Sequence, residues 1–175
     1  MIIKTLMTLT LAAVSGLANA QAAPPAAPPL RLEFAFSELV TLAGDITPGK
    51  TPRGDRNIVP ITGGTFEGPG DGHGIKGTII PGGWDWQLRR ADGCMEIKAD
   101  YFLKTDDGTV INIVNAGAIC RPAAGQPFLA RTTPVFEAPI GKYDWLNKGA
   151  FVGTLEPTKG PDGKSAVRIG IWRIR

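Results

Sequence analysis

The sequence predicts an all-β protein that folds as a single antiparallel β-barrel of about eight to ten strands. Apolar and polar residues alternate with a period of two over many short segments, which is typical of half-buried strands. The chain has 23 glycines and 15 prolines, which interrupt these segments as turn residues do. No stretch has the length and periodicity of a long helix. A sheet of many short strands protects its edges by stacking on another sheet or by closing into a barrel.

The N-terminal 20 residues have the features of an export signal. Lys4 supplies a positive charge, residues 5–16 are mostly apolar, and Ala18 and Ala20 are the small residues that signal peptidase accepts. This apolar run is shorter than the roughly 20 residues that a transmembrane helix needs. We therefore expect cleavage near Ala20 and a periplasmic or secreted protein that leaves the membrane after cleavage.

The remaining chain is expected to contain one folded domain. Residues 21–30 are rich in proline and alanine and are predicted to form an extended linker. Residues 31–175 suit one domain with one core. After removal of Lys4, 18 Lys and Arg remain against 16 Asp and Glu, and these charges are scattered. Because a nucleic-acid-binding surface usually has a basic stripe, no nucleic-acid partner is expected.

Extended segments follow one another along the chain, separated by turn residues. In the first, Leu32, Phe34 and Phe36 share one face, and the alternation is lost over residues 38–42, which predicts a bulge or a second short strand. Residues 45–54 have the composition of a loop, and residues 143–148 that of a turn or short helical piece. The predicted strands cover residues 31–37, 57–62, 65–67, 74–80, 84–90, 95–103, 109–115, 128–137, 150–155 and 165–175.

The clearest local structure is a hairpin that carries both cysteines. A three-residue turn with Gly108 in a left-handed conformation would pair Thr105 with Thr109. The same register, continued along both strands, places Cys94 opposite Cys120 if neither strand has a bulge. Opposed Cβ atoms lie close to the separation that a disulfide needs, and an exported protein with two cysteines favours pairing. We therefore predict a Cys94–Cys120 disulfide over the alternative of two unpaired thiols.

Familiar cofactor and metal patterns are weak. Residues 72–77 fit G-x-G-x-x-G, but a β-like run follows them where a dinucleotide site needs a helix. His73 is the single histidine and lies in this glycine-rich loop. A zinc site needs several His, Cys or acidic ligands. We therefore expect no cofactor and no metal.

One strand presents two chemically different faces. Trp84 and Trp86 share one face, and Asp85 and Gln87 share the other. Depending on which face points inward, a barrel gains either an aromatic wall or a carboxylate and an amide. Removal from water would raise the pKa of Asp85, as a general acid or base requires.

Several charged or polar residues lie in or beside apolar stretches, and buried charges need partners. Their arginines are interpreted either as partners of a carboxylate that brace the fold or as receptors for a ligand carboxylate or phenolate. These residues are Arg56, Glu67, Arg131 and Asn147.

Five ordered motifs resemble a bacterial and fungal family, the domain of unknown function 3237 family (DUF3237, also UPF0311). The motifs are residues 51–68 (TPRGDRNIVPITGGTFEG), 81–87 (PGGWDWQ), 105–108 (TDDG), 131–137 (RTTPVFE) and 143–147 (YDWLN). The resemblance runs from about residue 32 to the C-terminus. It implies an antiparallel barrel similar to those of allene oxide cyclases and dirigent proteins, and it implies no established activity.

Three functional hypotheses follow. The first is the binding of a small apolar or aromatic molecule inside the barrel. The second is a cofactor-free isomerase, cyclase or lyase in which Asp85 or Glu67 is the acid or base and Arg131 stabilises developing negative charge. The third is a structural exported module with a filled core. The ligand-binding residues predicted under the first hypothesis are Arg56, Trp84, Trp86, Tyr101, Trp145 and Asn147.

Overall fold

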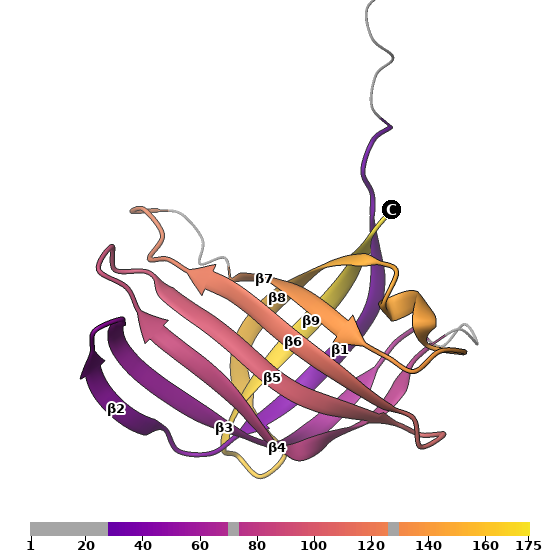
Figure 1. The fold of residues 1–175 in the computed structure, drawn as a ribbon, viewed down its shortest axis with the longest axis horizontal. Coiled ribbons are helices and arrows are strands. Elements are labelled where there is room, and N and C mark those ends of the chain that lie inside the picture. Colours follow the sequence, from indigo (N-terminus) through magenta and orange to yellow (C-terminus); the bar gives the residue numbers. More distant parts are fainter. Residues whose placement is uncertain (1–27, 70–73, 126–129) are drawn as a thin grey trace, which may run out of the picture.

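The chain forms a closed antiparallel barrel, seen in a computed structural model that describes residues 28–69, 74–125 and 130–175 (Figure 1). The predicted export signal, most of the predicted linker and His73 lie outside the described residues. The elements are β1 (Leu32–Leu42), β2 (Ile46–Thr51), β3 (Gly54–Glu67), β4 (Lys76–Arg89), β5 (Met95–Thr105), β6 (Val110–Ile119), β7 (Arg131–Glu137), the 3₁₀ helix η1 (Asp144–Leu146), β8 (Ala150–Lys159) and β9 (Ser165–Ile174).

Eight strands close the barrel and one lies outside the ring. The sheet order is β1-β9-β8-β7-β6-β5-β4-β3-β2, and an additional β1–β3 pairing completes the circle. The long strand β3 makes this possible because it changes partner along its length. Residues 61–67 pair with β1, and residues 54–58 pair with β2. The predicted antiparallel barrel is therefore confirmed. Among the described residues, no helix combines the length and the apolar character that a membrane crossing requires.

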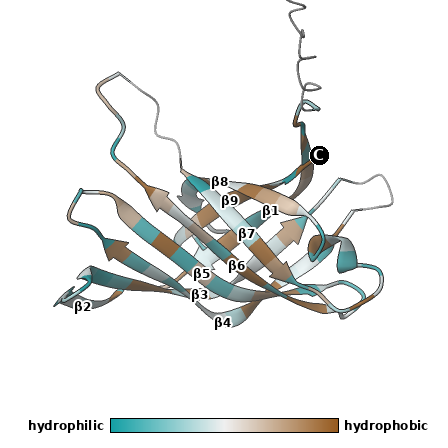
Figure 2. Cartoon of the chain, turned by 45° about the horizontal axis from the view of Figure 1, so that its top comes forward, coloured by the Kyte–Doolittle hydropathy of each residue, from teal (hydrophilic) through white to brown (hydrophobic). Residues whose placement is uncertain are grey.

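Alternation of side chains builds the interior. Hydrophobic and hydrophilic residues follow one another along the strands (Figure 2). In β5, for example, Ile97, Tyr101 and Leu103 are buried, whereas Lys98 and Lys104 are exposed. This is the period-two pattern that the sequence shows, and it gives each strand one face for the barrel interior and one for the outside.

The β5–β6 hairpin has the predicted register. Thr105 donates its backbone N–H to the carbonyl of Thr109 at 2.9 Å, and Gly108 has a φ of +87°. Pairing continues without a bulge to Met95 opposite Ile119. Cys94 and Cys120 lie one residue beyond and form a disulfide, as predicted.

Irregularities interrupt the pairing of two strands, and the one in β1 changes which residues face inward. In β1, Phe34 pairs with Trp172 and Phe36 with Ile171, so the bulge lies at residue 35. Phe34 is exposed and Phe36 is buried, so the prediction that they share one face is wrong. Beyond the bulge, alternate residues of β1 point inward, and one of them is Glu38. In β4, an irregularity between Ile80 and Trp84 joins the two strands predicted at residues 74–80 and 84–90 into one. Residues 46–51, predicted as loop, form β2, an edge position that tolerates proline.

The two ends of the barrel interior are filled differently. One end contains a cluster of phenylalanines packed edge to face, with ring centroids 5.0–6.0 Å apart; its members are Phe36, Phe66, Phe136 and Phe151. Leu146 of η1 belongs to the same core cluster. Because neighbouring strands run antiparallel, the starts of β1 and β8 and the ends of β3 and β7 all lie at this end. Large side chains close it, and the opposite end is left for a cavity.

Candidate functional site

A cavity of about 290 Å³ lies inside the barrel, away from the phenylalanine cluster. Aliphatic side chains from β1, β3, β5, β8 and β9 form most of its wall. Four polar side chains interrupt this wall, namely Asp85, Gln87, Tyr101 and Asn115. None of the described residues that line the cavity is Arg, Lys or His. The cavity is therefore mainly apolar, and its one ionisable wall residue besides Tyr101 is acidic.

Strand β4 turns its carboxylate and amide inward and its tryptophans outward. Gln87 Nε2 donates to Asp85 Oδ2 at 2.8 Å, and Asn57 Nδ2 donates to Gln87 Oε1 at 3.2 Å. Asp85 Oδ1 is buried and has no hydrogen-bond partner within the described parts of the chain. Burial raises the pKa of Asp85, and the hydrogen bonds from Gln87 and from the backbone of Lys98 partly oppose this rise. One carboxylate oxygen of this wall residue is therefore left without a hydrogen-bond partner.

A second acidic group lies inside the barrel, next to a residue of the cavity wall. Tyr101 lines the cavity, and its hydroxyl donates to Glu38 Oε2 at 2.5 Å. Glu38 is 1% exposed, and burial raises its pKa to about 7, although the hydrogen bond from Tyr101 lowers it. Burial, together with the negative charge of Glu38, raises the pKa of Tyr101 well above its usual range. Tyr101 therefore connects the cavity to a buried carboxyl group.

Sequence reasoning missed Glu38 because a charged residue interrupts the apolar pattern. The alternation of Phe36, Glu38, Val40 and Leu42 is unbroken if Glu38 is accepted as an interior residue. The loss of phase predicted over residues 38–42 was therefore the signal of an inward carboxyl group. A register shift between β1 and β3 does lie there, at residues 41 and 42.

Asn115 completes the polar part of the wall from β6. The residue is 2% exposed, and its Oδ1 has no hydrogen-bond partner among the described residues. Thr132 of β7 is 3% exposed and its Oγ1 is likewise unpaired. Sequence reasoning named neither residue, although Asn115 lies in the predicted hairpin on the same face as Ile111 and Ile113.

The predicted site residues are distributed over three regions. Asp85 and Tyr101 line the cavity. Trp84 and Trp86 point away from it and are 40% and 46% exposed, so the aromatic face of β4 is the outer one. Arg56 lies with Trp86 outside the barrel, with its guanidinium carbon 6.0 Å from the ring centroid. The outer tryptophans thus do not form a wall of the interior cavity.

The other predicted residues also lie away from the cavity. Glu67 and Arg131 are exposed, and Arg131 donates to the carbonyl of Ala130 at 3.0 Å. Asn147 binds both backbone groups of Ala138 at 2.8 Å, as acceptor and as donor. Trp145 packs on Phe151 near the closed end. The structure does not bring Glu67 or Arg131 together with Asp85.

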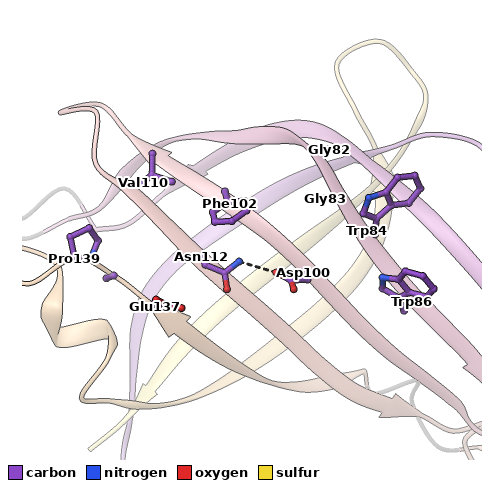
Figure 3. A pocket seen from close by; sticks show the side chains of 11 residues that line it. Gly82, Gly83, Trp84, Trp86, Asp100, Phe102, Val110, Asn112, Glu137 and Pro139 are labelled. Atoms are coloured by element: carbon purple, nitrogen blue, oxygen red, sulfur yellow. Dashed lines mark hydrogen bonds between the residues drawn. The ribbon is translucent and has the colours of Figure 1, made fainter.

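An outer groove of about 810 Å³ lies over β4, β5 and β6 and the residues that follow β7 (Figure 3). Trp84 and Trp86 lie side by side on β4, and Asn112 Nδ2 donates to Asp100 Oδ1 at 2.8 Å near the middle of the groove. Phe102 is 48% exposed beside them. This groove is open on the outer face of the barrel and is separate from the interior cavity.

The disulfide lies at the rim of the interior cavity. Met95 and Ile119, which line the cavity, directly adjoin Cys94 and Cys120. The bond therefore fixes the ends of β5 and β6 where the cavity wall begins. Within the described parts of the chain, no three His, Cys, Asp or Glu side chains gather as a metal site would require.

These features define a closed antiparallel β-barrel with a mainly apolar interior cavity. The family described as "Protein of unknown function (DUF3237)" matches residues 30–174, and the chain belongs to this family. A UPF0311 protein of Rhodopseudomonas palustris strain TIE-1 is 34% identical over an alignment of 140 residues, and the match covers 73% of this chain and 88% of the relative. A UPF0311 protein of Clostridium acetobutylicum is 32% identical over an alignment of 136 residues, and the match covers 70% of this chain and 84% of that protein.

Solved structures share the barrel. A β-barrel-like protein of Acinetobacter baumannii AYE has a TM-score of 0.72 and 30% identity, covering 86% of this chain and 99% of that chain. A structure described as an enzyme from Penicillium herquei has a TM-score of 0.66 and 26% identity, covering 87% of this chain and 100% of that chain. The fold predicted from the resemblance is therefore found in several relatives.

Proposed function

We propose that the barrel interior binds a small molecule with an apolar or aromatic body. The observation that carries the proposal is the cavity of about 290 Å³. Ligand pockets usually measure about 300–1,000 Å³, and a cavity of about 150 Å³ holds benzene. The cavity is therefore suited to a ligand about the size of two fused rings.

The composition of the wall favours ligand binding over the hypothesis of a structural module with a filled core. Ligand pockets are mostly apolar with a few placed polar groups that fix orientation. Here the apolar part is aliphatic, with Val40, Ile97 and Ile169 among its members, and Tyr101 is its one aromatic residue among those described. The ligand would therefore pack against methyl groups, and Trp84 and Trp86 would take no part.

The proposal is tested by filling the cavity. Ala99 lies on β5 between Asp85 and Asn115, so Ala99→Phe would occupy the space of the ligand. Ala118→Phe makes the same change on the exposed outer face of β6 and is the matched control. Purified full-length protein, incubated with an extract of small metabolites and washed, would be denatured, and the released molecules identified by mass spectrometry.

We expect wild type and Ala118→Phe to retain the same molecule and Ala99→Phe to lose it. Retention of that molecule by Ala99→Phe at the wild-type level would contradict binding in the cavity. Circular dichroism spectra of the three proteins would establish that each is folded.

A second candidate function is cofactor-free acid–base catalysis, as in an isomerase, cyclase or lyase. The observation that favours it is the unpaired Oδ1 of Asp85 in the wall, on a group whose pKa burial raises. A carboxyl group of this kind can exchange a proton with a bound molecule. The similar structure described as an enzyme from Penicillium herquei adds support.

In this proposal, Asp85 takes a proton from the bound molecule or gives one to it. Arg131, predicted to stabilise developing negative charge, is exposed outside the cavity, and the Tyr101 hydroxyl already donates its proton to Glu38, so neither residue is given that role. Asp85→Asn is expected to retain the bound molecule but to stop its conversion, as followed by chromatography. Conversion at the wild-type rate by Asp85→Asn would rule out this mechanism.

A further inference from the structure

We propose that the cavity selects a ligand that donates hydrogen bonds and carries no negative charge. The ligand would place a hydroxyl or N–H group against Asp85 and Asn115 and its apolar body towards the disulfide-linked rim. This inference rests on the proposed binding function and specifies the chemistry of the ligand's polar group.

The first argument is the identity of the unpaired atoms. Among the described residues, the buried side-chain atoms without a hydrogen-bond partner are all oxygens: Glu38 Oε1, Asp85 Oδ1, Asn115 Oδ1 and Thr132 Oγ1. A buried polar atom left unpaired costs about 1–3 kcal/mol, and most such atoms in native proteins have partners. Two of these atoms, Asp85 Oδ1 and Asn115 Oδ1, belong to residues that line the cavity, and carboxylate and amide oxygens accept hydrogen bonds. A ligand with a hydroxyl or N–H group therefore fits this part of the wall.

The second argument is the position of two of these oxygens. Asp85 pairs with Ala99 across β4 and β5, and Ala99 pairs with Asn115 across β5 and β6. All three side chains line the cavity. Neighbouring strands are about 4.7–4.9 Å apart. Asp85 and Asn115 lie on either side of the small Ala99 methyl group, and their backbones are separated by roughly twice that spacing. A ligand lying over Ala99 is within reach of both oxygens.

The third argument is the sign of the charge. Asp85 lines the cavity, Glu38 lies behind Tyr101, and no described wall residue carries a positive charge. A bound carboxylate would lose its hydration without gaining a partner of opposite charge and would face a second acidic group, both of which are unfavourable. The cavity should therefore bind an uncharged hydrogen-bond donor more tightly than an anion.

The apolar residues at the rim determine how the ligand is oriented. Met95 and Ile119 line the cavity where β5 begins and β6 ends, next to the Cys94–Cys120 bond. The closed end is occupied by the phenylalanine cluster. A ligand with one polar and one apolar end therefore orients its polar group towards the middle of the barrel.

Three probes that share one ring system test the inference: 2-naphthol, which has a hydroxyl donor, 2-methoxynaphthalene, which has none, and 2-naphthoate, which is an anion. Dissociation constants for the full-length protein would be measured by isothermal titration calorimetry at pH 6. We expect 2-naphthol to bind about tenfold more tightly than 2-methoxynaphthalene, which is the upper range for one uncharged hydrogen bond. We expect 2-naphthoate to bind most weakly.

Two variants locate the donor contact. Asn115→Leu keeps a similar size and removes the acceptor, and it is expected to reduce the advantage of 2-naphthol to less than threefold while 2-methoxynaphthalene binds as before. Asn112→Leu is the matched control because Asn112 lies on the same strand, faces outward and bonds Asp100. It should leave the ratio of the two dissociation constants unchanged.

The outcomes separate this inference from the binding proposal. Equal affinity for 2-naphthol and 2-methoxynaphthalene in wild type, or tightest binding of 2-naphthoate, would overturn the donor inference and leave cavity binding in place. Absence of binding by all three probes would overturn both. The wild-type comparison does not depend on the folding of any variant.

Discussion

Glu38 is a carboxyl group that is almost completely removed from water. It lies inside the barrel, and among the described residues its side-chain hydrogen bond comes from Tyr101. A carboxyl group in such a position favours its protonated form, because ionisation without a positive partner is costly. Its protonation state therefore links the interior of the barrel to the pH of the surroundings.

Glu38→Gln is expected to flatten the dependence of stability on pH. In the unfolded chain Glu38 loses its proton near its ordinary pKa of 4.5, and in the fold near pH 7. As pH rises between these values the unfolded state binds fewer protons, so the free energy of unfolding falls, and above pH 7 this fall ends. Between pH 5 and pH 8 the component from Glu38 amounts to roughly 2–3 kcal/mol.

Urea unfolding of wild type and Glu38→Gln at the two pH values would measure this component. The variant should lose roughly 2–3 kcal/mol less than wild type on going from pH 5 to pH 8. Parallel losses in the two proteins would show that Glu38 does not titrate as its burial indicates.

Tyr101→Phe is expected to raise the pKa of Glu38 further. The substitution removes the hydrogen bond that lowers this pKa and leaves both carboxyl oxygens unpaired. The free energy of unfolding should fall by about 1–3 kcal/mol at neutral pH. A carbon-13 NMR titration of the Glu38 carboxyl group would follow the pKa directly, and a lower pKa in the variant would contradict the geometry.

At the scale of single residues, the sequence indicated which side chains of β4 share a face but not which face is inside. Trp84 and Asp85 alternate, and both arrangements were compatible with a barrel. The apolar face of β4 is the outer one here, where it lines the outer groove with Phe102. Asp85 is buried by side chains of other strands. Which strands surround it depends on how the sheet closes, and the residues next to Asp85 in the sequence do not indicate this.

At the scale of elements, the β5–β6 hairpin was predictable in detail. Its turn contains Gly108 at the position that needs positive φ, and apolar residues face one another on both strands. The turn and the facing apolar residues therefore determine the register of the hairpin, and this register places Cys94 opposite Cys120. Bulges at residue 35 and at residues 81–83 were less accessible because they adjust β1 and β4 to partners far away in the sequence.

The Cys94–Cys120 bond is expected to stabilise the fold substantially. It joins residues separated by 26 positions, and a loop of this size corresponds to about 3 kcal/mol. The double variant Cys94→Ser/Cys120→Ser should unfold in urea with a free energy lower by about this amount. Wild type treated with dithiothreitol should match the variant, whereas a loss that only the variant shows would point to packing of the sulfur atoms.

At the scale of the whole molecule, the barrel has one filled and one hollow half. The phenylalanine cluster supplies much of the apolar core, so the hollow half can keep space and polar groups. A ligand that enters this half binds the folded state alone and therefore stabilises it.

Occupation of the cavity is expected to raise the melting temperature. At a free concentration of 2-naphthol one hundred times its dissociation constant, the free energy of unfolding should rise by about 2.7 kcal/mol. For a domain of this size the melting temperature should increase by roughly 5–10 °C. Scanning calorimetry should show this increase in wild type and Ala118→Phe and none in Ala99→Phe; an equal increase in all three would place the ligand elsewhere.

Strand β2 leaves one edge of the sheet without a neighbour, since it pairs with β3 alone among the described strands. This edge includes Pro48, which has no amide hydrogen, and Lys50, which is exposed and charged. Its register against β3 also shifts between Ile46 and Gly49. Proline, lysine and irregular pairing each hinder the addition of a foreign strand. Strand β2 thus terminates the sheet and hinders edge-to-edge aggregation.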